Sequence, residues 1–421
     1  MSELNKYDKT VSVMVVVNKD LMRTINRLAI LHMIRDVGAI SRVDISRATG
    51  LSQSAVTGIT AELLEEGIIV EKPGSKGGGG RRPVPLAFNP QGVFTVGVHL
   101  SVNQLIVVLL NLQAEILYTS TVPLHEDGLA VDTVVDTLTL AVQTCLWESN
   151  FSKNQIAGIG IAVPGLIDSR KGAIYSVPNY GWRDVQFAQL VAQRTGVPVY
   201  VENSANALVL FEQWFGVGRG TDNFLLVTTE HGIGMGMVAE GKMLRGARGL
   251  AGEFGHIVVD RNGPACRCGE QGCLEAICSN NAILRDAQAA VNAGAWKRES
   301  TKNMTIEEIL AEVDRGNESL RAIYKKVGER LGVGLNNLCK VFDPQTVVLS
   351  GKGVLAGEHL FAPMRTTLHE DISFQVGSPV WLHVQKWEAT NYAKGAGVLV
   401  LEKIYNAPAD MAEKTPVAVR V

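Results

Sequence analysis

Apolar side chains recur every three or four positions between residues 20 and 70, which is the spacing of one buried face of a helix. Glycines and short polar segments divide this stretch, and Gly38 ends the first predicted helix. The pattern therefore predicts three short helices. The buried face expected for the first helix carries Leu21, Ile25, Leu28, Leu31 and Ile34.

The second predicted helix is short and has capping residues at both ends. Ser41 stands three positions before Asp44, which is the spacing of a capping box, and Gly50 ends the helix. We expect the apolar residues Val43 and Ala48 of this helix to face inward.

The third predicted helix has one apolar and one polar face. Ser52 can cap its first turn. The buried face carries Val56, Ile59 and Leu63. The opposite face is short, polar and nearly uncharged, with Gln53, Ser54, Thr57 and Thr60.

This arrangement is typical of a helix-turn-helix, whose second helix lies in the major groove of DNA and contacts base edges with its N-terminal side chains. Short polar side chains suit that position. The candidate base contacts are Ser52, Gln53, Ser54 and Thr57. Three-helix units also occur in proteins that never bind DNA, so the helices alone leave both interpretations open.

Two predicted strands, at residues 68–71 and 84–88, flank a loop that holds five glycines and four cations over residues 72–82. Glycines pack nothing and cost backbone entropy, so we interpret the loop as a basic wing that lets Arg81 and Arg82 follow a DNA groove. The alternative is a flexible linker. Residues 1–90 carry twelve Lys and Arg against nine Asp and Glu, an excess that supports nucleic-acid binding only weakly.

From residue 94 onward the hydrophobic pattern changes to that of strands alternating with helices. The first set has strands at 94–100, 105–110 and 116–121, a helix over about 131–148 and a β-rich glycine run at 156–163. A second set begins at 223–229 and ends with a strand at 346–350 and a helix near 392–405. We expect two similar α/β halves, with the cleft between them as the ligand site.

The composition is that of a folded protein with two or three domains. Of the 421 residues, 46% are hydrophobic and 19% are charged, which excludes a disordered chain, a collagen-like chain and a small disulfide scaffold. Apolar stretches such as 105–110 fall far short of the roughly 18 residues that a membrane span needs, and residues 1–10 are too polar for a signal peptide. We therefore expect a cytoplasmic protein with no membrane partner.

Three of the six cysteines lie close together in a glycine-rich loop, at positions 266, 268 and 273, and His256 precedes them. Three thiolates and one imidazole form a closed tetrahedral site for Zn²⁺. We predict a structural zinc at His256, Cys266, Cys268 and Cys273; the alternative is three reduced core cysteines. The other cysteines, Cys145, Cys278 and Cys339, lie in apolar helical contexts and are expected to act as small hydrophobic residues.

The segments Gly252-Glu-Phe-Gly-His256 and Cys266-Arg-Cys-Gly-Glu-Gln-Gly-Cys-Leu-Glu275 resemble the signature of the ROK family of sugar kinases and sugar-responsive repressors. With its N-terminal helix-turn-helix, the chain is similar to the repressor branch from about residue 18 to 405. The resemblance implies a two-lobed actin-like (ribonuclease H-like) α/β fold, a zinc site beside a sugar pocket, and a homodimer or homotetramer. The expected domains are a winged helix-turn-helix at 1–90 and a ROK domain at 91–421.

The resemblance also assigns sugar-contacting residues, carried over one position at a time. Gly165 follows Pro164 in the loop before the sugar, Asn179 corresponds to a hydroxyl-binding asparagine, and residues 202–206 lie where the kinases have Glu-Asn-Asp-Ala-Asn. Carboxylates, amides and an imidazole suit the recognition of vicinal hydroxyls. The implied ligand-binding residues are Gly165, Asn179, Asn203, Ser204, Glu253, His256 and Glu275.

Three departures from the kinase pattern argue against phosphoryl transfer. Ser204 replaces the aspartate that serves as the base, and a serine cannot take that role without a partner. Residues 99–103 read His-Leu-Ser-Val-Asn where the kinases have Asp-x-Gly-Gly-Thr, so side chains obstruct the approach to phosphate and the metal-binding carboxylate is absent. Glu230 places a carboxylate in the second phosphate loop, where it would repel ATP.

These observations predict a non-enzymatic, DNA-binding transcriptional regulator, a repressor, that binds double-stranded operator DNA and a sugar or sugar-phosphate effector. One alternative is an active sugar kinase that also binds DNA. Another is a repressor whose signal comes from a protein partner, because a protein interface leaves no motif in this sequence.

Overall fold

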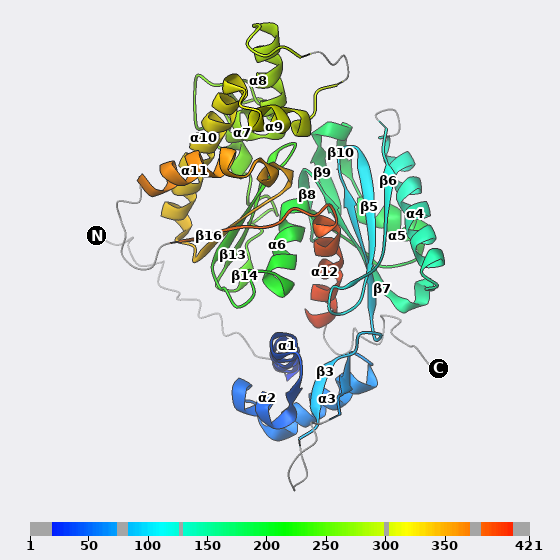
Figure 1. The fold of residues 1–421 in the computed structure, drawn as a ribbon. Helices are drawn as coiled ribbons and strands as arrows, with labels where there is room; N and C mark the ends of the chain where they lie inside the picture. The colour runs from blue at the N-terminus through cyan, green and yellow to red at the C-terminus, as the bar shows by residue number, and fades with distance from the viewer. Residues whose placement is uncertain (1–18, 74–82, 126–128, 299–302, 371–379, 407–421) are drawn as a thin grey trace, which may run out of the picture. The chain divides into compact units, whose positions relative to one another are not determined.

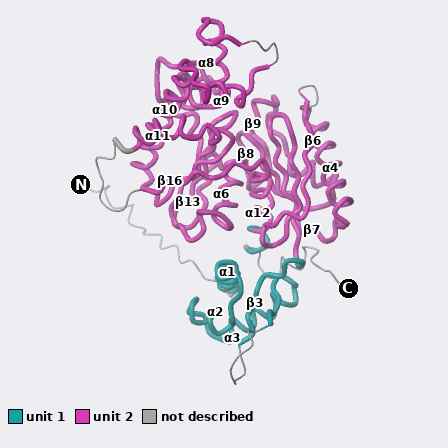
Figure 2. The backbone as a smooth tube through the Cα atoms, in the orientation of Figure 1, with its two compact units in different colours: residues 1–92, 402–421 teal, residues 93–401 magenta. Residues whose placement is uncertain are grey.

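The computed structural model describes residues 19–73, 83–125, 129–298, 303–370 and 380–406. The chain forms two compact units, one of residues 1–92 with 402–421 and the other of residues 93–401 (Figure 2). Among the described residues, none of the helices is both long and apolar enough to cross a membrane.

The described residues of the first unit form three helices, a small sheet and the last turn of α12 (Asn391–Asn406) (Figure 1). The helices are α1 (Lys19–Val37), α2 (Arg42–Thr49) and α3 (Gln53–Glu65). The antiparallel sheet has the order β1-β3-β2, with bounds Ile40–Ser41, Pro85–Phe88 and Ile69–Glu71. Both expected wing strands are present, whereas residues 74–82 of their connection, with Arg81 and Arg82, lie outside the described residues.

Hydrogen bonds at the helix ends confirm the predicted caps. The Ser41 hydroxyl accepts from the backbone N–H of Asp44 at 3.2 Å, and the Ser52 hydroxyl accepts from that of Ala55 at 3.2 Å. Gly50 ends α2 with φ 71°, a left-handed conformation that glycine adopts without strain. The chain thus turns from α2 to α3 within residues 50–52, as a helix-turn-helix requires.

The buried faces of α1 and α2 differ from the prediction. Ile25 is 48% exposed, Val43 is 43% exposed and Ala48 is also exposed, so their inward placement was wrong. In α2 only Ile45 is buried, because a helix of two turns presents a narrow strip to its neighbours. The buried residues of α1 are Arg27, Ile30, Leu31 and Ile34.

The apolar face of α3 is confirmed, with one correction. Val56, Ile59 and Leu63 are buried as expected, but Thr60 is fully buried and not on the free polar face. Thr60 follows Val56 by four positions and therefore shares its face. Its hydroxyl donates to the Val56 carbonyl at 2.8 Å and accepts from Arg42 Nε at 3.1 Å, which satisfies the buried oxygen.

Two arginines one turn apart on α1 pair with two glutamates at the end of α3. Arg27 is almost fully buried, and its two terminal nitrogens bind the two carboxylate oxygens of Glu66. Arg23 pairs with Glu62 at the surface, where 51% of the Arg23 side chain is exposed. These pairs fix α1 across the helix that carries the candidate base contacts.

The second unit contains two five-stranded sheets and one small sheet (Figure 1). The first has the order β11-β7-β4-β5-β6: Val199–Asn203, Ile156–Val163, Phe94–Leu100, Gln104–Leu110 and Ile116–Pro123. The second has the order β14-β13-β12-β15-β16: Lys242–Met243, Ile233–Ala239, Phe224–Thr229, Thr346–Ser350 and Trp381–Val384. The small sheet has the order β10-β9-β8: Trp182–Val185, Ala173–Val177 and Leu166–Asp168.

Helices cover both large sheets and also fill the space between them. Helices α4 (Val131–Glu148) and α5 (Phe187–Thr195) share one core with the first sheet. The core of the second sheet includes α7 (Leu274–Cys278), α8 (Asn280–Asn292), α9 (Ile306–Asp314), α10 (Glu318–Phe342) and α11 (Glu358–Glu370). Helices α6 (Ser204–Phe215) and α12 (Asn391–Asn406) lie between the sheets (Figure 1). The predicted pair of α/β lobes is confirmed.

Glycines in the first sheet allow α12 to approach it closely. A Cβ on Gly160 of β7 would lie 1.7 Å from the Ala396 carbonyl oxygen, and a Cβ on Gly97 of β4 would lie 1.9 Å from that of Ala393. No larger residue fits at either position without displacing the helix. The glycine-rich composition of the 156–163 run therefore reflects helix packing.

Candidate functional site

A cavity of about 570 Å³ lies between the two lobes of the second unit. Its wall is formed by the ends of β4 and β7, the start of α6, the β12–β13 turn and the loop that leads into α7. All seven residues expected to contact a sugar line this cavity: Gly165, Asn179, Asn203, Ser204, Glu253, His256 and Glu275. Residues separated by up to 110 positions in the sequence are thus brought to one wall.

The start of α6 places two of these residues at the cavity. The Asn203 side chain caps the helix, since its Oδ1 accepts from the backbone N–H of Ala205 at 2.8 Å while its Nδ2 donates to the Gly165 carbonyl at 2.9 Å. Ser204 follows as the first helical residue, and its buried hydroxyl has no hydrogen-bond partner among the described residues. A buried hydroxyl of this kind at a cavity wall is available to a ligand.

Glu253 directly precedes the short helix η4 (Phe254–His256), and His256 is the last residue of that helix. Oε2 of Glu253 lies 3.8 Å from Nε2 of His256, and both side chains are partly exposed. Burial raises the pKa of the Glu253 carboxyl, and the neighbouring His256 opposes this shift. The imidazole thus presents Nε2 toward the cavity and Nδ1 toward the cysteines.

Glu275 is the most deeply buried carboxylate of the seven residues, with 6% exposure. Arg267 binds it with Nε to Oε1 at 2.6 Å and with a terminal nitrogen to Oε2 at 3.0 Å. The backbone N–H of Ile233 also donates to Oε2, at 3.2 Å. Arg267 lines the cavity as well. The sequence pattern does not indicate this role, although Arg267 is the single cation between Arg261 and Arg285.

Glu202, in contrast, acts as an internal anchor. It is 1% exposed, and its Oε1 accepts from the Asn203 backbone N–H at 2.9 Å and from Asn206 Nδ2 at 3.1 Å. Its Oε2 accepts from Arg245 Nε at 2.8 Å. Glu202 therefore joins β11 and α6 to the loop after β14, and both of its oxygens are occupied within the protein.

Side chains occupy the side of the cavity that the family resemblance assigns to the kinase phosphate loops. His99 stacks on Tyr392 with a centroid distance of 4.5 Å, and burial lowers the pKa of His99 to about 3, so this imidazole is neutral. Ser101 and Val102 follow it along the wall. Residues 99–102 thus offer neither a carboxylate nor a bare glycine backbone that could hold a metal-bound phosphate.

Glu230 is held by neighbours on the same side. Its Oε1 accepts from the indole N–H of Trp387 at 3.0 Å and from the backbone N–H of Lys352 at 3.2 Å. Burial raises the pKa of Glu230, and these hydrogen bonds oppose the shift. The carboxylate thus remains at the wall of the cavity, where the sequence predicted that it would oppose ATP.

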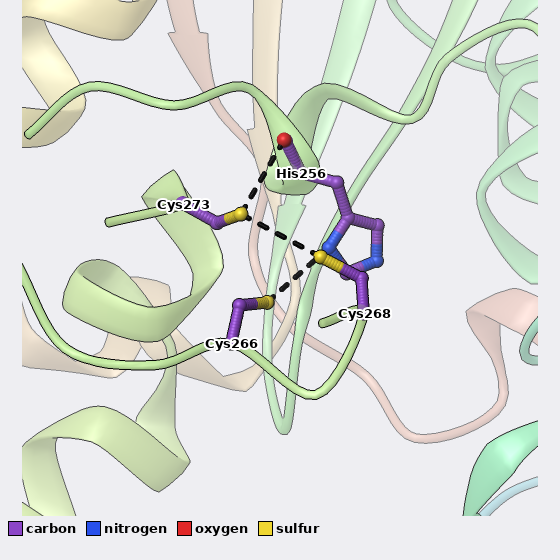
Figure 3. Close-up of side chains that lie close together, drawn as sticks. All are labelled: His256, Cys266, Cys268 and Cys273. Atoms are coloured by element: carbon purple, nitrogen blue, oxygen red, sulfur yellow. Dashed lines mark hydrogen bonds between the residues drawn. The ribbon is translucent and has the colours of Figure 1, made fainter. Parts of the chain in front are cut away.

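The four predicted metal ligands form one cluster (Figure 3). Their ligand atoms all lie within 4.8 Å of one another, with Cys268 Sγ 3.6 Å from Cys273 Sγ and His256 Nδ1 3.5 Å from Cys266 Sγ. Two sulfurs each about 2.3 Å from a tetrahedral ion lie about 3.8 Å apart. The cluster can therefore hold a metal ion, and its donor set is one that suits zinc. The other three cysteines lie on α4, α7 and α10, outside the cluster.

The candidate base contacts gather at the N-terminal end of α3. The side chains of Gln53, Ser54 and Thr57 are exposed, and Ser52 is exposed beside them as the cap. The Thr57 hydroxyl donates to the Gln53 carbonyl at 2.7 Å, and the Ser54 hydroxyl lies 3.1 Å from that of Ser52. The Gln53 amide is accordingly the strongest candidate for a base contact, because glutamine can bind adenine through two hydrogen bonds.

Comparison with known families matches both units of the chain. The ROK family model matches residues 95–403, and a winged helix-turn-helix DNA-binding model matches residues 23–70. A putative xylose repressor of Caldicellulosiruptor sp. (strain Rt8B.4) is 34% identical over 359 residues, which cover 84% of this chain and 89% of the relative. The DNA-binding transcriptional dual regulator NagC of Escherichia coli (strain K12) is 27% identical over 365 residues, which cover 86% and 89%.

Solved structures match the same architecture. A ROK family transcriptional regulator, a homologue of the E. coli MLC protein, superposes with a TM-score of 0.80 at 26% identity and covers 94% of this chain and 99% of its own. A ROK family glucokinase from Streptomyces griseus, solved with glucose and AMPPNP, gives a TM-score of 0.65 at 27% identity, with 73% and 99% coverage. The regulator thus matches nearly the whole chain, whereas the kinase matches about three quarters of it.

Proposed function

The chain belongs to the ROK family, and from this premise we propose that it is a transcriptional repressor whose kinase-derived domain binds a sugar or sugar phosphate. The observation that carries the proposal is the presence, in one chain, of a helix-turn-helix with an exposed polar α3 and a cavity lined by seven sugar-type contacts. Residues 1–90 bind operator DNA, and residues 91–421 bind the effector. The protein works in the cytoplasm as a homodimer or homotetramer.

The effector is recognised through its hydroxyl groups. Glu253 and Glu275 accept from hydroxyls, Asn179 donates or accepts, and His256 contributes the ring nitrogen that faces away from the cysteines. Ser204 carries no charge, so a phosphate or another substituent on the nearby hydroxyl meets no repulsion there. A free hydroxyl can bond to the same serine, so both kinds of sugar are candidates.

Zinc is the metal that we assign to His256, Cys266, Cys268 and Cys273. Four protein ligands close its coordination sphere, so its role is structural and it supplies no open position for chemistry. By holding residues 256–273 together, these ligands keep Glu253, His256 and Glu275 at the wall of the cavity.

We expect no sugar kinase activity. The native protein should not transfer phosphate from ATP to a hexose, and Ser204→Asp alone should not restore transfer, because His99, Ser101 and Val102 still occupy the phosphate side. A coupled assay of ATP turnover with glucose, xylose and N-acetylglucosamine checks this. Sugar-dependent turnover by the native protein would instead support the alternative of an active kinase with a DNA-binding unit.

DNA recognition is expected to depend on α3 and the wing. Gln53→Ala should remove about 1–3 kcal/mol of discrimination at the base that it contacts. Replacing both Arg81 and Arg82 with Ala should weaken binding to all sequences and lower the salt slope by about two. Fluorescence anisotropy with operator duplexes at several salt concentrations measures both effects. Glu65→Gln, at the opposite end of α3, serves as the control.

Gln53→Ala should alter base preference, whereas the double replacement of Arg81 and Arg82 should weaken binding to all sequences. Unchanged operator affinity in both variants would contradict the assigned interface. If the protein is a dimer, the operator should be palindromic, with half-sites about one or two helical turns apart.

Effector binding should change the affinity for DNA. Glu253→Gln is expected to leave operator binding intact and to abolish release by sugar, because it removes a charged hydroxyl acceptor from the cavity without breaking a helix cap. Asn203→Ala should do the same but also destabilise α6 by about 1 kcal/mol, since Asn203 caps that helix. Glu240→Gln, on the β13–β14 turn outside the cavity, is the control.

Release is measured by titrating xylose, glucose, N-acetylglucosamine and their phosphates into the protein–operator complex. Coupling is reciprocal, so a sugar that weakens operator binding tenfold must bind tenfold more weakly to the DNA complex. A Glu253→Gln protein that responds like the native one would show that the signal enters elsewhere, for example through a protein partner.

A further inference from the structure

Arg267 connects the metal loop to the wall of the cavity. Its backbone lies between Cys266 and Cys268, two of the proposed zinc ligands, and its side chain extends to Glu275. The Arg267 side chain is 43% exposed, whereas that of Glu275 is 7% exposed. A carboxylate buried to this extent needs a paired charge or several hydrogen bonds, and Arg267 supplies both.

The contact is a two-point fork. Nε of Arg267 donates to one Glu275 oxygen at 2.6 Å and a terminal nitrogen donates to the other at 3.0 Å. This geometry fixes the plane of the carboxylate as well as its position. A Cβ on Gly232 would lie 2.3 Å from Oε2 of Glu275 and 3.3 Å from the same arginine nitrogen, so the glycine leaves room for the pair. Oε1 keeps acceptor capacity for one further donor, whereas Oε2 already accepts from Arg267 and from the Ile233 backbone N–H.

The third nitrogen of the guanidinium faces the other lobe. It donates to Oδ1 of Asn179 at 3.4 Å, and Asn179 lies on η3 (Pro178–Tyr180), 88 positions away in the sequence. With Oδ1 directed at the arginine, the Asn179 amide keeps its NH₂ group as the donor for a ligand. One arginine therefore sets the hydrogen-bonding role of two groups that line the cavity.

We propose that Arg267 is a specificity-determining positioning residue of the effector pocket. It holds Glu275 as a fixed acceptor and Asn179 as a fixed donor, and the pocket thereby selects a sugar that presents a hydroxyl donor at Glu275 and an oxygen acceptor at Asn179. The inference rests on the proposed function, because it assumes that the cavity binds a sugar.

Calorimetric titration of the full chain tests the proposal with D-xylose, D-glucose and N-acetyl-D-glucosamine as probes. The sugar that the native protein binds most tightly is then compared with its monodeoxy derivatives. In the native protein, loss of the hydroxyl that donates to Glu275 should weaken binding about ten- to a hundredfold. In Arg267→Ala, the deoxy derivative and the parent sugar should bind with nearly equal dissociation constants, because Glu275 no longer holds a fixed orientation.

Two further variants separate positioning from a structural role. Arg267→Lys should restore little discrimination, because an ammonium group cannot span both oxygens. Gly232→Ala disturbs Glu275 from outside the metal loop and should reproduce the loss of discrimination. Arg330→Ala is the matched control: Arg330 is 40% exposed and pairs with Asp260 near the metal loop, outside the cavity lining.

The zinc content of each variant is measured alongside binding. The proposal would be overturned if Arg267→Ala or Gly232→Ala discriminated between the parent sugar and its deoxy derivative as strongly as the native protein does. The proposed sugar-binding function would not be affected by that result. Loss of discrimination in Arg330→Ala as well would also overturn the proposal, since general support of the loop would then explain the effect. If the native protein binds none of the three sugars, the proposed function itself fails and this inference fails with it.

Discussion

Cys266→Ala is expected to remove the zinc ion and to weaken sugar binding and sugar-dependent release of DNA. The four ligand atoms lie within 4.8 Å of one another and come from residues 256–273, so the proposed ion would be the common contact of this loop. Structural zinc contributes an apparent free energy of about 10–16 kcal/mol in zinc-finger peptides near pH 7. Loss of one of the four direct ligands should lower zinc affinity by more than the roughly 10- to 100-fold loss that follows when a group hydrogen-bonded to a ligand is removed.

The effect should reach the cavity because metal ligands and cavity residues alternate in the same segment. His256 belongs to both sets, and Glu275 follows Cys273 by two positions. We therefore expect that, without the proposed ion, the loop no longer fixes the positions of Glu253, Arg267 and Glu275.

Elemental analysis of the purified protein and calorimetry with the three probe sugars measure the two outcomes. Cys339→Ala, a cysteine of α10 outside the cluster, should retain one zinc per chain and bind sugar normally. Native protein without any metal, after purification free of chelators, would contradict the zinc assignment.

Arg27→Ala is expected to destabilise the first unit by about 3–5 kcal/mol and to abolish operator binding. The Arg27 side chain is 3% exposed, and removing it leaves the partly buried Glu66 carboxylate without its counter-charge. This pair also holds α1 against the end of α3, so its loss releases the helix that carries Gln53 and Thr57. Most single substitutions cost less, because few remove one partner of a buried ion pair.

Arg23→Ala provides the matched control one turn away. Arg23 pairs with Glu62 on the same two helices, but the exposed fractions of these side chains are 51% and 30%. An exposed pair of this kind contributes about 0–1 kcal/mol. Hydrogen exchange at the amides of α1 and α3 reports on the first unit alone, and anisotropy reports operator binding. Equal effects of the two substitutions would show that burial of Arg27 does not set the strength of its pair.

Local features of the fold followed from the sequence because each depends on neighbours along the chain. The helix at Val131–Glu148 and the strand at Ile156–Val163 begin and end where the hydrophobic pattern placed them. The caps at Ser41 and Ser52 bond to N–H groups three positions away. The metal cluster is also a local feature, since three of its ligands lie within eight residues of one another.

The tertiary structure decided which faces are covered and which side chains meet across the cavity. Hydrophobic periodicity gives the angle of a residue around its helix but does not say how wide a strip its neighbours cover, so Ile25 and Val43 were misplaced. Thr60 was misplaced for another reason: its polarity was given more weight than its spacing of four positions from the buried Val56. Polar pairs that do not follow the repeat of a single helix or strand leave no periodic signal. Arg267 with Glu275 and Asn179, Arg245 with Glu202, and Arg27 with Glu66 therefore became visible only when the folded chain placed their atoms within bonding distance.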